Sequence, residues 1–423
     1  MIARKIAIVG GGPVGLEAAL RARREGHEVV LFEAGRIAEH VERYGPVRLF
    51  TPFGMNATEL GRRLLGEAGV KLPLQDEILT AAELRRRYLL PLAALPDLRG
   101  VLREGLRVVG IAREGVSKGS ESRSERPFLL RIENARGTSA MERADVVIDA
   151  SGVYGQPGAT GPGGLWAGGE DALGMRLEHH LPDIRGEARP RYAGKRILLV
   201  GDGRSISNAL VDLDEVVRGS GVGALTRVEM VHRDRGYDVL APVPQGELDQ
   251  LPALRALQER AGRIVREAAW IRRHPGATIV AYRTLPSGAI ETTLTHPRGG
   301  ETRVEVDRVL ALVGYRPDLT LFRELRIHLC YASEGPMALA AAIQAAAKGD
   351  PDVGCLGQIS HGPDTLKNPE PDFYVLGNKS YGRGSEFLLA VGHSQVEDVM
   401  TLIGVAEPRV AAGIPGAVNV ESL

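Results

Sequence analysis

The residues best suited to chemistry in this sequence are three glycines, Gly10, Gly12 and Gly15, and the carboxylate Glu33. The glycines follow a short apolar run and open a helix-like segment, and Glu33 ends the next apolar run. A turn without side chains lets a pyrophosphate approach the backbone at a helix N-terminus, where N–H groups and the helix dipole favour negative charge. A carboxylate about 20 residues later can accept hydrogen bonds from an adenosine ribose. This arrangement predicts a dinucleotide site, with an incidental structural turn as the alternative.

A second glycine turn has the same layout later in the chain. Gly201 and Gly203 follow the apolar run 197–200 and open another helix-like segment. Ile206 stands where a small residue usually allows the helix to pack closely on the strand, so this helix is expected to lie farther from its sheet. Two dinucleotide units in one chain are more informative than either unit alone.

Cationic side chains follow the second strand of this later unit, where the earlier unit has its acid. They are His232, Arg233 and Arg235. Cations at this position suit a 2′-phosphate and therefore favour NADPH, with ordinary surface arginines as the alternative.

The composition of the 423-residue chain is that of an ordinary soluble protein of two or three domains. Lys+Arg and Asp+Glu both number 53, so the net charge gives no support for a nucleic-acid or membrane-surface partner. The sequence enters an apolar strand almost at once and has no apolar run near the ~20 residues that span a bilayer, so we expect a cytoplasmic protein. Its two cysteines, Cys330 and Cys355, are too few for a zinc cluster and form no CxxC pair.

Apolar patterns predict the strands and helices between these motifs. Strands are expected at 107–112, 128–132, 144–149, 278–282, 291–295, 304–313 and 373–378, and helices at 58–67, 80–95, 337–348 and 386–403. The segment 117–126, rich in serine and charge, is predicted to be an exposed hairpin loop, and 47–56 a packed connection. The glycines at 161–164 indicate a crossing into a second domain.

The order of these parts resembles the two-dinucleotide-binding-domain flavoproteins, the superfamily that includes thioredoxin reductase, bacillithiol disulfide reductase and the flavin-containing monooxygenases. The resemblance covers almost the whole chain. It rests on Gly10, Gly12, Gly15, Glu33, the strand end 149–152, Gly201, Gly203, the return sequence 314–318, and the turn Gly377-Asn378.

The resemblance implies an α/β fold with two Rossmann-like domains, each built of three layers in a ββα arrangement. The FAD-binding domain would consist of residues 1–165 and 326–423, with an NAD(P)H-binding domain, 166–325, inserted in it. In the family the last strand places a Gly-Asp pair on the FAD ribityl chain, and here Asn378 stands where the Asp would be. Asparagine still accepts a hydrogen bond, so the site is retained.

The residues expected to bind the two cofactors follow from these motifs. For FAD they are Gly10, Gly12, Pro13, Val14, Gly15, Glu33, Val108, Ser151, Gly152, Gly377 and Asn378; for NADPH they are Gly201, Gly203, Arg204, Ser205, His232, Arg233 and Arg235.

Three residues are candidate catalytic residues. Asn56 lies in a segment that passes the isoalloxazine ring in similar flavoproteins; its amide could bond that ring, with turn capping as an equal alternative. Lys379 could stabilise negative charge on reduced flavin, and the alternative is an exposed lysine. Cys355 precedes the final strand, and a buried structural cysteine is the safer interpretation both there and at Cys330.

The resemblance further implies a bacterial-type oxidoreductase in which NADPH reduces FAD and the flavin passes electrons to a small-molecule acceptor such as a disulfide or quinone. A monooxygenase using O2 and a non-enzymatic redox sensor are the alternatives. Pro13-Val14 occupies the place of the bacillithiol reductase cysteine, and the monooxygenase fingerprint has only a faint echo at 179–182. His361 and His393 are candidate proton donors. We expect no nucleic-acid or membrane partner, and a homodimer.

Overall fold

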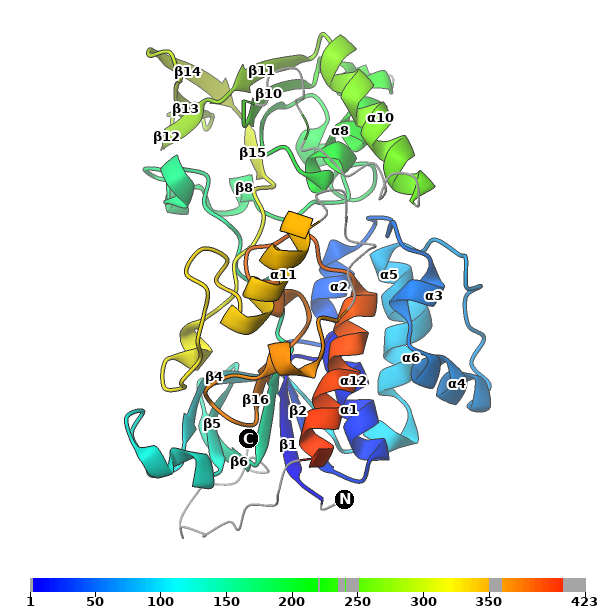
Figure 1. Ribbon diagram of the computed structural model, residues 1–423. Helices are drawn as coiled ribbons and strands as arrows, with labels where there is room; N and C mark the ends of the chain where they lie inside the picture. Colours follow the sequence, from blue (N-terminus) through cyan, green and yellow to red (C-terminus); the bar gives the residue numbers. More distant parts are fainter. Residues whose placement is uncertain (1–2, 220, 235–239, 241–250, 350–359, 406–423) are drawn as a thin grey trace. The chain divides into compact units, whose positions relative to one another are not determined.

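The computed structural model describes residues 3–219, 221–234, 240, 251–349 and 360–405, and the chain divides into two compact units (Figure 1). Unit 1 consists of Met1–Glu42, Thr51–Gln156 and Arg316–Leu423, and unit 2 of Arg43–Phe50 and Pro157–Tyr315. The main segment of unit 2 is therefore an insertion in the sequence of unit 1. The predicted connection at 47–56 is divided between the two units, and Val47 is buried in the core of unit 2.

The centre of unit 1 is a five-stranded parallel sheet in the order β16-β7-β1-β2-β3. Its strands are β1 Lys5–Val9, β2 Glu28–Glu33, β3 Leu102–Glu104, β7 Val146–Asp149 and β16 Phe373–Val375. Strand β7 is buried along its whole length and begins with the apolar run 146–148, which suits a sheet that is covered on both faces. Because all strands run in one direction, their carboxyl ends meet at one edge.

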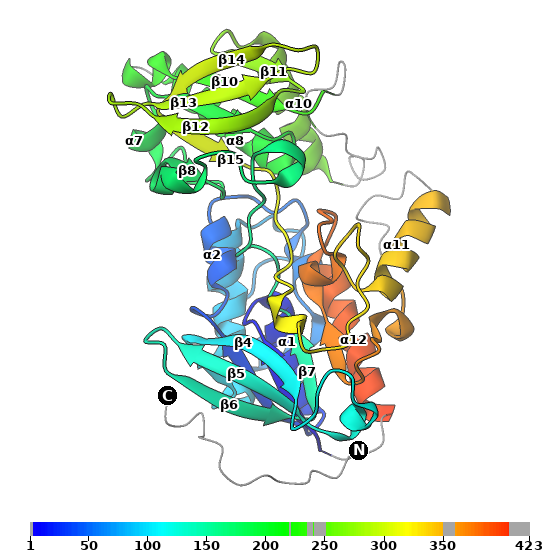
Figure 2. The same ribbon diagram turned by 90° about the vertical axis from the view of Figure 1, so that its left-hand side faces the viewer.

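Helices cover one face of this sheet and an antiparallel sheet covers the other (Figure 2). Helices α1 Pro13–Arg24 and α12 Leu389–Val405 lie side by side on the first face. The second face packs on β4 Leu106–Arg113, β5 Phe128–Asn134 and β6 Ser139–Ala144, through a core that includes Phe32, Phe128 and Phe373. Unit 1 therefore has the three layers predicted from the sequence.

Unit 1 and its connections contain further helices. They are α2 Glu39–Tyr44, α3 Phe53–Asn56, α4 Glu59–Glu67, α5 Ala81–Leu84, the π-helical turn η1 Arg85–Leu89, α6 Leu90–Ala93 and α11 Met337–Gly349. The predicted helix 80–95 begins with a capping box of Thr80 and Glu83, but it is broken by the π turn. Pro91 follows that turn, and because proline has no N–H it cannot donate to the Arg87 carbonyl as a regular helix requires.

Unit 2 repeats the layered arrangement. Its parallel sheet has the order β11-β10-β9-β15-β8, formed by β8 Leu177–Glu178, β9 Arg196–Val200, β10 Arg227–His232, β11 Ile271–Pro275 and β15 Arg308–Ala311. Helices α7 Arg189–Tyr192, α8 Arg204–Arg218 and α10 Pro252–Glu267 accompany it, and the antiparallel strands β12 Thr278–Thr284, β13 Ile290–Thr295 and β14 Glu301–Val306 form the other layer. The described residues of both units also form 3-10 turns. They are η2 Pro96–Leu98, η3 Glu121–Glu125, η4 Pro162–Gly164, η5 Asp171–Arg176, η6 Gly221–Leu225, η7 Thr320–Phe322, η9 Pro363–Leu366 and η10 Gly377–Tyr381.

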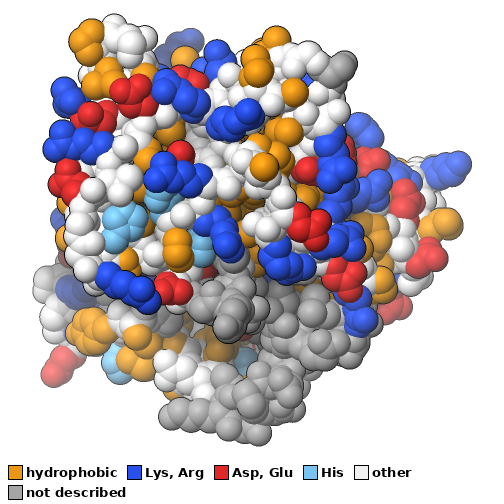
Figure 3. All heavy atoms as spheres, turned by 90° about the horizontal axis from the view of Figure 1, so that it is seen from above, with side chains coloured by type: hydrophobic (Ala, Val, Ile, Leu, Met, Phe, Trp, Pro, Cys, Tyr) orange, Lys and Arg blue, Asp and Glu red, His pale blue; other side chains and the backbone are white. Residues whose placement is uncertain are grey.

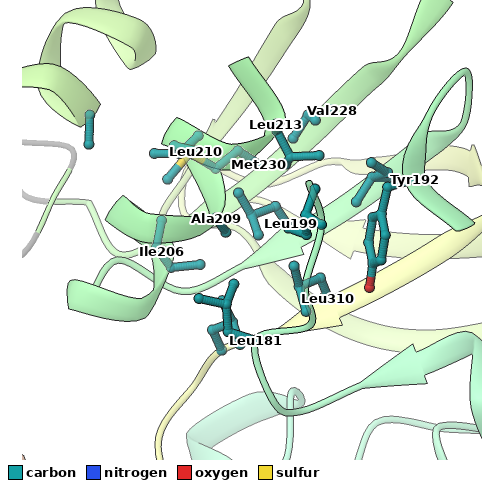
Figure 4. Packing of buried hydrophobic residues seen from close by; sticks show 14 of the residues in the cluster. Leu181, Tyr192, Leu199, Ile206, Ala209, Leu210, Leu213, Val228, Met230 and Leu310 are labelled. Carbon is teal, nitrogen blue, oxygen red and sulfur yellow. The ribbon is translucent and has the colours of Figure 1, made fainter. Parts of the chain in front are cut away.

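Ile206 packs into the core between α8 and the sheet of unit 2 (Figure 4). Its side chain is fully buried, and a Cβ added at Gly201 would lie 3.2 Å from the Ile206 Cγ1. Gly201 has φ 128°, a conformation that disfavours other residues. A Cβ at Gly201 would also lie 2.5 Å from the Leu312 carbonyl oxygen, so the glycine leaves room for that oxygen as well as for Ile206.

Other parts of the chain also differ from the sequence-based prediction. Strand β6 was missed, because Ser139–Ala144 alternates polar and apolar residues too weakly to be recognised. The predicted strand 304–313 is two strands, β14 and β15, which belong to different sheets. The predicted exposed loop 117–126 holds the turn η3 and a buried arginine, Arg123, whose guanidinium bonds Glu370.

The described part of the chain has no helix long and apolar enough to cross a membrane. Figure 3 shows basic and acidic side chains interspersed over one face, in keeping with the equal numbers of both signs.

Candidate functional site

The first glycine turn lies where β1 meets α1, at the carboxyl edge of the unit 1 sheet. Gly10 has φ 103°, and a Cβ there would lie 2.7 Å from the Ala150 carbonyl oxygen. A Cβ at Gly15 would lie 2.0 Å from the Gly10 carbonyl oxygen. At Gly12, by contrast, the position of a Cβ has no described atom within 4 Å. Two of the glycines are thus required by packing, and the third faces open space at the helix N-terminus.

Glu33 is held beside this turn by two backbone groups. The Gly11 N–H donates to Oε2 over 2.7 Å, and the Gly35 N–H donates to Oε1 over 2.8 Å. Each carboxylate oxygen keeps capacity to accept a further hydrogen bond. The acid is therefore fixed in place with acceptors available for hydroxyl groups.

The end of β7 carries a buried ion pair that the sequence did not predict. Lys379 Nζ lies 2.7 Å from Asp149 Oδ2 and 3.1 Å from Ser151 Oγ, and both charged side chains are fully buried. Ser151 in turn donates its hydroxyl and its N–H to Asp149 Oδ1, over 2.6 and 3.0 Å. The Lys379 ammonium also lies 4.7 Å from the Phe322 ring centroid. Lys379 is thus not the exposed lysine considered as the alternative, and its role toward reduced flavin stays a prediction.

The turn after β16 meets the first glycine turn. Gly377 has φ 69°, and a Cβ there would lie 3.3 Å from Val14 Cγ2. Its N–H donates to Gln395 Oε1 over 2.8 Å, and its carbonyl accepts from the Ser380 hydroxyl over 2.7 Å. The neighbouring Asn378 Oδ1 is buried and has no hydrogen-bond partner among the described residues. This orphaned acceptor lies in the turn where the sequence places a ribityl contact.

Three more residues expected near FAD are Asn56, Val108 and Gly152, and each has a different local environment. Asn56 donates both amide hydrogens to the carbonyls of Thr51 and Pro52 and accepts from the Thr51 hydroxyl, so the structure has the turn-capping arrangement and leaves no amide hydrogen for a flavin. Val108 lies in strand β4, and its side chain is buried in the core between the two sheets of unit 1. Gly152, with φ 69°, has no described atom within 4 Å of a Cβ position.

His393 and Cys330 have surroundings that the sequence did not indicate. Burial lowers the pKa of His393 to about 4, so at neutral pH this ring carries no extra proton. Cys330, predicted to be buried, is partly exposed, and a hydrogen bond from Ser333 lowers the pKa of its thiol. Cys355 lies outside the described residues.

The second glycine turn joins β9 to α8 in unit 2. Gly203 is the N-cap of α8, and like Gly12 it has no described atom within 4 Å of a Cβ position. Arg204 and Ser205 are the first residues of the helix. An anion at this turn would meet the N–H groups of the helix N-terminus.

Asp202, between Gly201 and Gly203, is an acid that sequence reasoning overlooked. Asp202 is buried and is bonded by Arg233, whose Nε lies 3.0 Å from Oδ2 and whose Nη2 lies 2.8 Å from Oδ1. The sequence does show an acid inside a glycine turn and an arginine directly after the next strand, which together could have suggested this ion pair. Only the parallel pairing of β9 with β10 brings them together.

The expected cationic cluster is altered by this contact. His232 is buried, its Nδ1 lies 2.8 Å from the Arg233 carbonyl oxygen, and burial lowers the pKa of the ring, so it is neutral at pH 7. Arg235 lies outside the described residues. Of the two described members, one is neutral and the other is paired with an acid.

No protein-family model and no curated protein matches the chain. Among solved structures, bacillithiol disulfide reductase from Bacillus cereus superposes with a TM-score of 0.64 at 16% identity, covering 95% of this chain and 99% of that one. The cadaverine monooxygenase of the desferrioxamine pathway from Erwinia amylovora, bound to FAD, gives 0.62 at 14% identity over 99% of both chains. Ornithine N-hydroxylase from Kutzneria sp. 744, with reduced FAD, NADP+ and ornithine, gives 0.60 at 14% identity over 95% of this chain and 99% of that one. The chain therefore shares the fold of these proteins, with two units that each hold a five-stranded parallel sheet.

This likeness confirms the fold expected from the two glycine turns. The similar structures include disulfide reductases and monooxygenases, so the fold itself does not separate these two chemistries.

Proposed function

We propose that this chain is an FAD-dependent NAD(P)H oxidoreductase. The observation that carries the proposal is the pair of open glycine turns, at Gly12 and Gly203, each at a helix N-terminus on the carboxyl edge of its own parallel sheet. Ligands of such sheets bind outside the carboxyl ends of the strands. One chain with two such edges suits two dinucleotides that exchange electrons.

The residues of unit 1 fit FAD. Gly12 leaves room for the pyrophosphate, Glu33 offers acceptors to the adenosine ribose, and the orphaned Asn378 Oδ1 offers an acceptor to a ribityl hydroxyl. Bound there, FAD would accept a hydride and pass the electrons on. Pro13, Val14, Gly152 and the Val108 backbone complete the proposed FAD contacts. The Lys379–Asp149 pair supports the strand end beside the cofactor and does not itself touch the flavin in this proposal.

The residues of unit 2 fit a nicotinamide dinucleotide. Gly203, with Arg204 and Ser205 behind it, forms the pyrophosphate turn. A preference for NADPH stays a prediction, because His232 is neutral and Arg233 is shared with Asp202. We therefore propose NAD(P)H as the donor.

We propose a small molecule as the acceptor, with a reductase as the first candidate. The bacillithiol disulfide reductase likeness covers nearly the whole of both chains, and a small acceptor needs no CxxC relay, which this sequence lacks. A monooxygenase is the second candidate, favoured by the equally complete likeness to the cadaverine monooxygenase.

The test uses the purified full chain loaded with FAD. NADH or NADPH oxidation is followed with and without O2, in the presence of low-molecular-weight disulfides, quinones or diamines, and products are identified by mass spectrometry. A reductase gives anaerobic turnover with a disulfide or quinone. A hydroxylated amine formed only with O2 would favour the monooxygenase, and failure to take up FAD would contradict both.

A further inference from the structure

The two parallel sheets carry corresponding residues where the second strand of each dinucleotide unit ends. Strand β1 pairs with β2, and β9 pairs with β10, in the same register relative to the glycine turn that follows. The last paired residues are Val9 with Phe32 and Val200 with Val231. The residue that comes next is Glu33 in unit 1 and His232 in unit 2. His232 therefore stands where unit 1 has the acid proposed to bind the adenosine ribose.

The neighbouring strand, β3 in unit 1 and β11 in unit 2, gives two more corresponding positions. Leu102 of β3 pairs with Leu31, and Arg273 of β11 pairs with Met230, one register step before Phe32 and Val231. Opposite Glu33 lies Glu104, and opposite His232 lies Pro275. This corner of the sheet thus has two acids and a leucine in unit 1, but a histidine, a proline and an arginine in unit 2.

Arg273 and His232 lie on the same face of the unit 2 sheet. Side chains alternate between the two faces of a strand, and Met230 belongs to the core cluster between this sheet and α8 (Figure 4). His232, two residues after Met230, and Arg273, its partner in the register, share that face. Arg273 precedes the strand end by two residues, about 7 Å, a distance that a long arginine side chain can cover. It is exposed and forms no hydrogen bond or ion pair with another described residue.

The charge of Arg273 acts at the position of His232. Burial is the main cause of the lowered pKa of this histidine, and the positive charge of Arg273 acts in the same direction. Asp202 and Asp234 act in the opposite direction, and Asp202 is bonded by Arg233. Arg273 therefore brings a positive charge to the corner that is acidic in unit 1.

We propose that Arg273 is the residue of unit 2 that recognises the 2′-phosphate of NADPH. A guanidinium can form parallel, charge-assisted hydrogen bonds with a phosphate, whereas a carboxylate at the ribose position would repel it. This inference rests on the proposed function of unit 2. It assigns the nucleotide selectivity to strand β11, where sequence reasoning did not look, and not to Arg233 at the end of β10. The two assignments predict different results for the same variants.

The experiment measures binding of NAD+ and NADP+ to the FAD-loaded full chain by calorimetry, without turnover. The wild type should bind NADP+ more tightly than NAD+. We expect Arg273→Ala to weaken NADP+ binding by about tenfold or more, as for loss of a hydrogen bond to a charged group, and to leave NAD+ binding nearly unchanged. Arg272→Ala is the matched control, because it removes the adjacent exposed arginine, which lies on the opposite face of the same strand. This control should bind both nucleotides as the wild type does.

Three results would overturn the inference: a wild type that does not favour NADP+, an Arg273→Ala variant that weakens both nucleotides equally, and a selectivity that is lost in Arg233→Ala but kept in Arg273→Ala. Thermal melting establishes folding for each variant. Should Arg273→Ala not fold, Arg273→Lys keeps the charge without the bidentate geometry. It should weaken NADP+ and spare NAD+, and equal weakening of both would contradict the inference. Wild-type protein that binds neither nucleotide would instead contradict the proposed function.

Discussion

At the scale of single residues, two groups of buried charges are matched by partners from distant parts of the sequence. Lys379 and Asp149 are both fully buried and 2.7 Å apart. Glu370 accepts from Arg113 and Arg123, all three with side chains at most 3% exposed. Such pairs add little net stability over apolar packing, yet the loss of one member leaves a buried charge alone.

Substituting Lys379 with Met should lower the free energy of unfolding by about 3 to 5 kcal/mol, because Asp149 would remain buried without its cation. Urea unfolding at neutral pH measures the change. Adding Asp149→Asn should recover much of the loss, since no charge is then left unpaired. Lys367→Ala, at an exposed lysine, is the control and should shift stability by less than about 0.5 kcal/mol. An equal effect of both lysine substitutions would contradict the role given to the pair.

The buried His27 should make stability depend on pH. His27 is buried, its Nδ1 accepts from the Arg4 N–H over 3.2 Å, and burial lowers the pKa of the ring. The unfolded chain then binds a proton that the folded chain does not, so this contribution is complete above the unfolded pKa of about 6.5 and is lost as pH falls below it. His27→Asn keeps an acceptor for Arg4 and should flatten the slope of unfolding free energy between pH 7 and 5. An unchanged slope in His27→Asn would contradict the pH dependence assigned to this histidine.

At the scale of elements, the strand, glycine turn and helix of each unit combine two kinds of glycine. Gly15 lies against the Gly10 carbonyl oxygen and permits the helix to pack, whereas Gly12 lies against open space. Because Gly12 has φ −80°, an L residue can adopt its backbone conformation without strain. Packing and ligand binding can therefore be separated within one turn.

Gly12→Ala should leave the melting temperature of the FAD-free protein nearly unchanged and lower its FAD content, because the new methyl group occupies the space left for the pyrophosphate. Gly15→Ala should destabilise the fold itself, since its Cβ would lie 2.0 Å from a backbone oxygen. Flavin absorbance of the purified variants and melting of the stripped proteins distinguish the two effects. A Gly12→Ala protein with full FAD content would contradict the placement of the pyrophosphate.

At the scale of the whole molecule, each compact unit holds one parallel sheet and one glycine turn. The chain completes unit 1 only after the insertion, when β16 pairs with β7 and brings Gly377 against Val14. Unit 1 is therefore assembled from both ends of the described chain, while the glycine turn of unit 2 is built within a single segment.

Gly203→Ala should affect only the nucleotide of unit 2. Its backbone, with φ −84°, tolerates alanine, and the added methyl group would occupy the open space at the α8 N-terminus. We expect the variant to retain FAD but to be reduced by NAD(P)H at least about tenfold more slowly at low nucleotide concentration. Stopped-flow reduction measures this rate, and reduction by dithionite serves as the control for an intact flavin. Parallel loss of FAD would show that the two sites do not act separately.

The sequence by itself determined the fold class, both glycine turns and the position of most strands along the chain. These features depend on local patterns: apolar runs, turn glycines and helix starts. Only the tertiary structure decided which charges are neutralised. Arg123 lies in a polar stretch, yet it bonds Glu370 across 247 positions, and Lys379 bonds Asp149 across 230. Arg233 meets Asp202 because two parallel strands end side by side. A residue's type and local spacing give its charge, but its partner and its burial depend on segments that come together only when the sheets form.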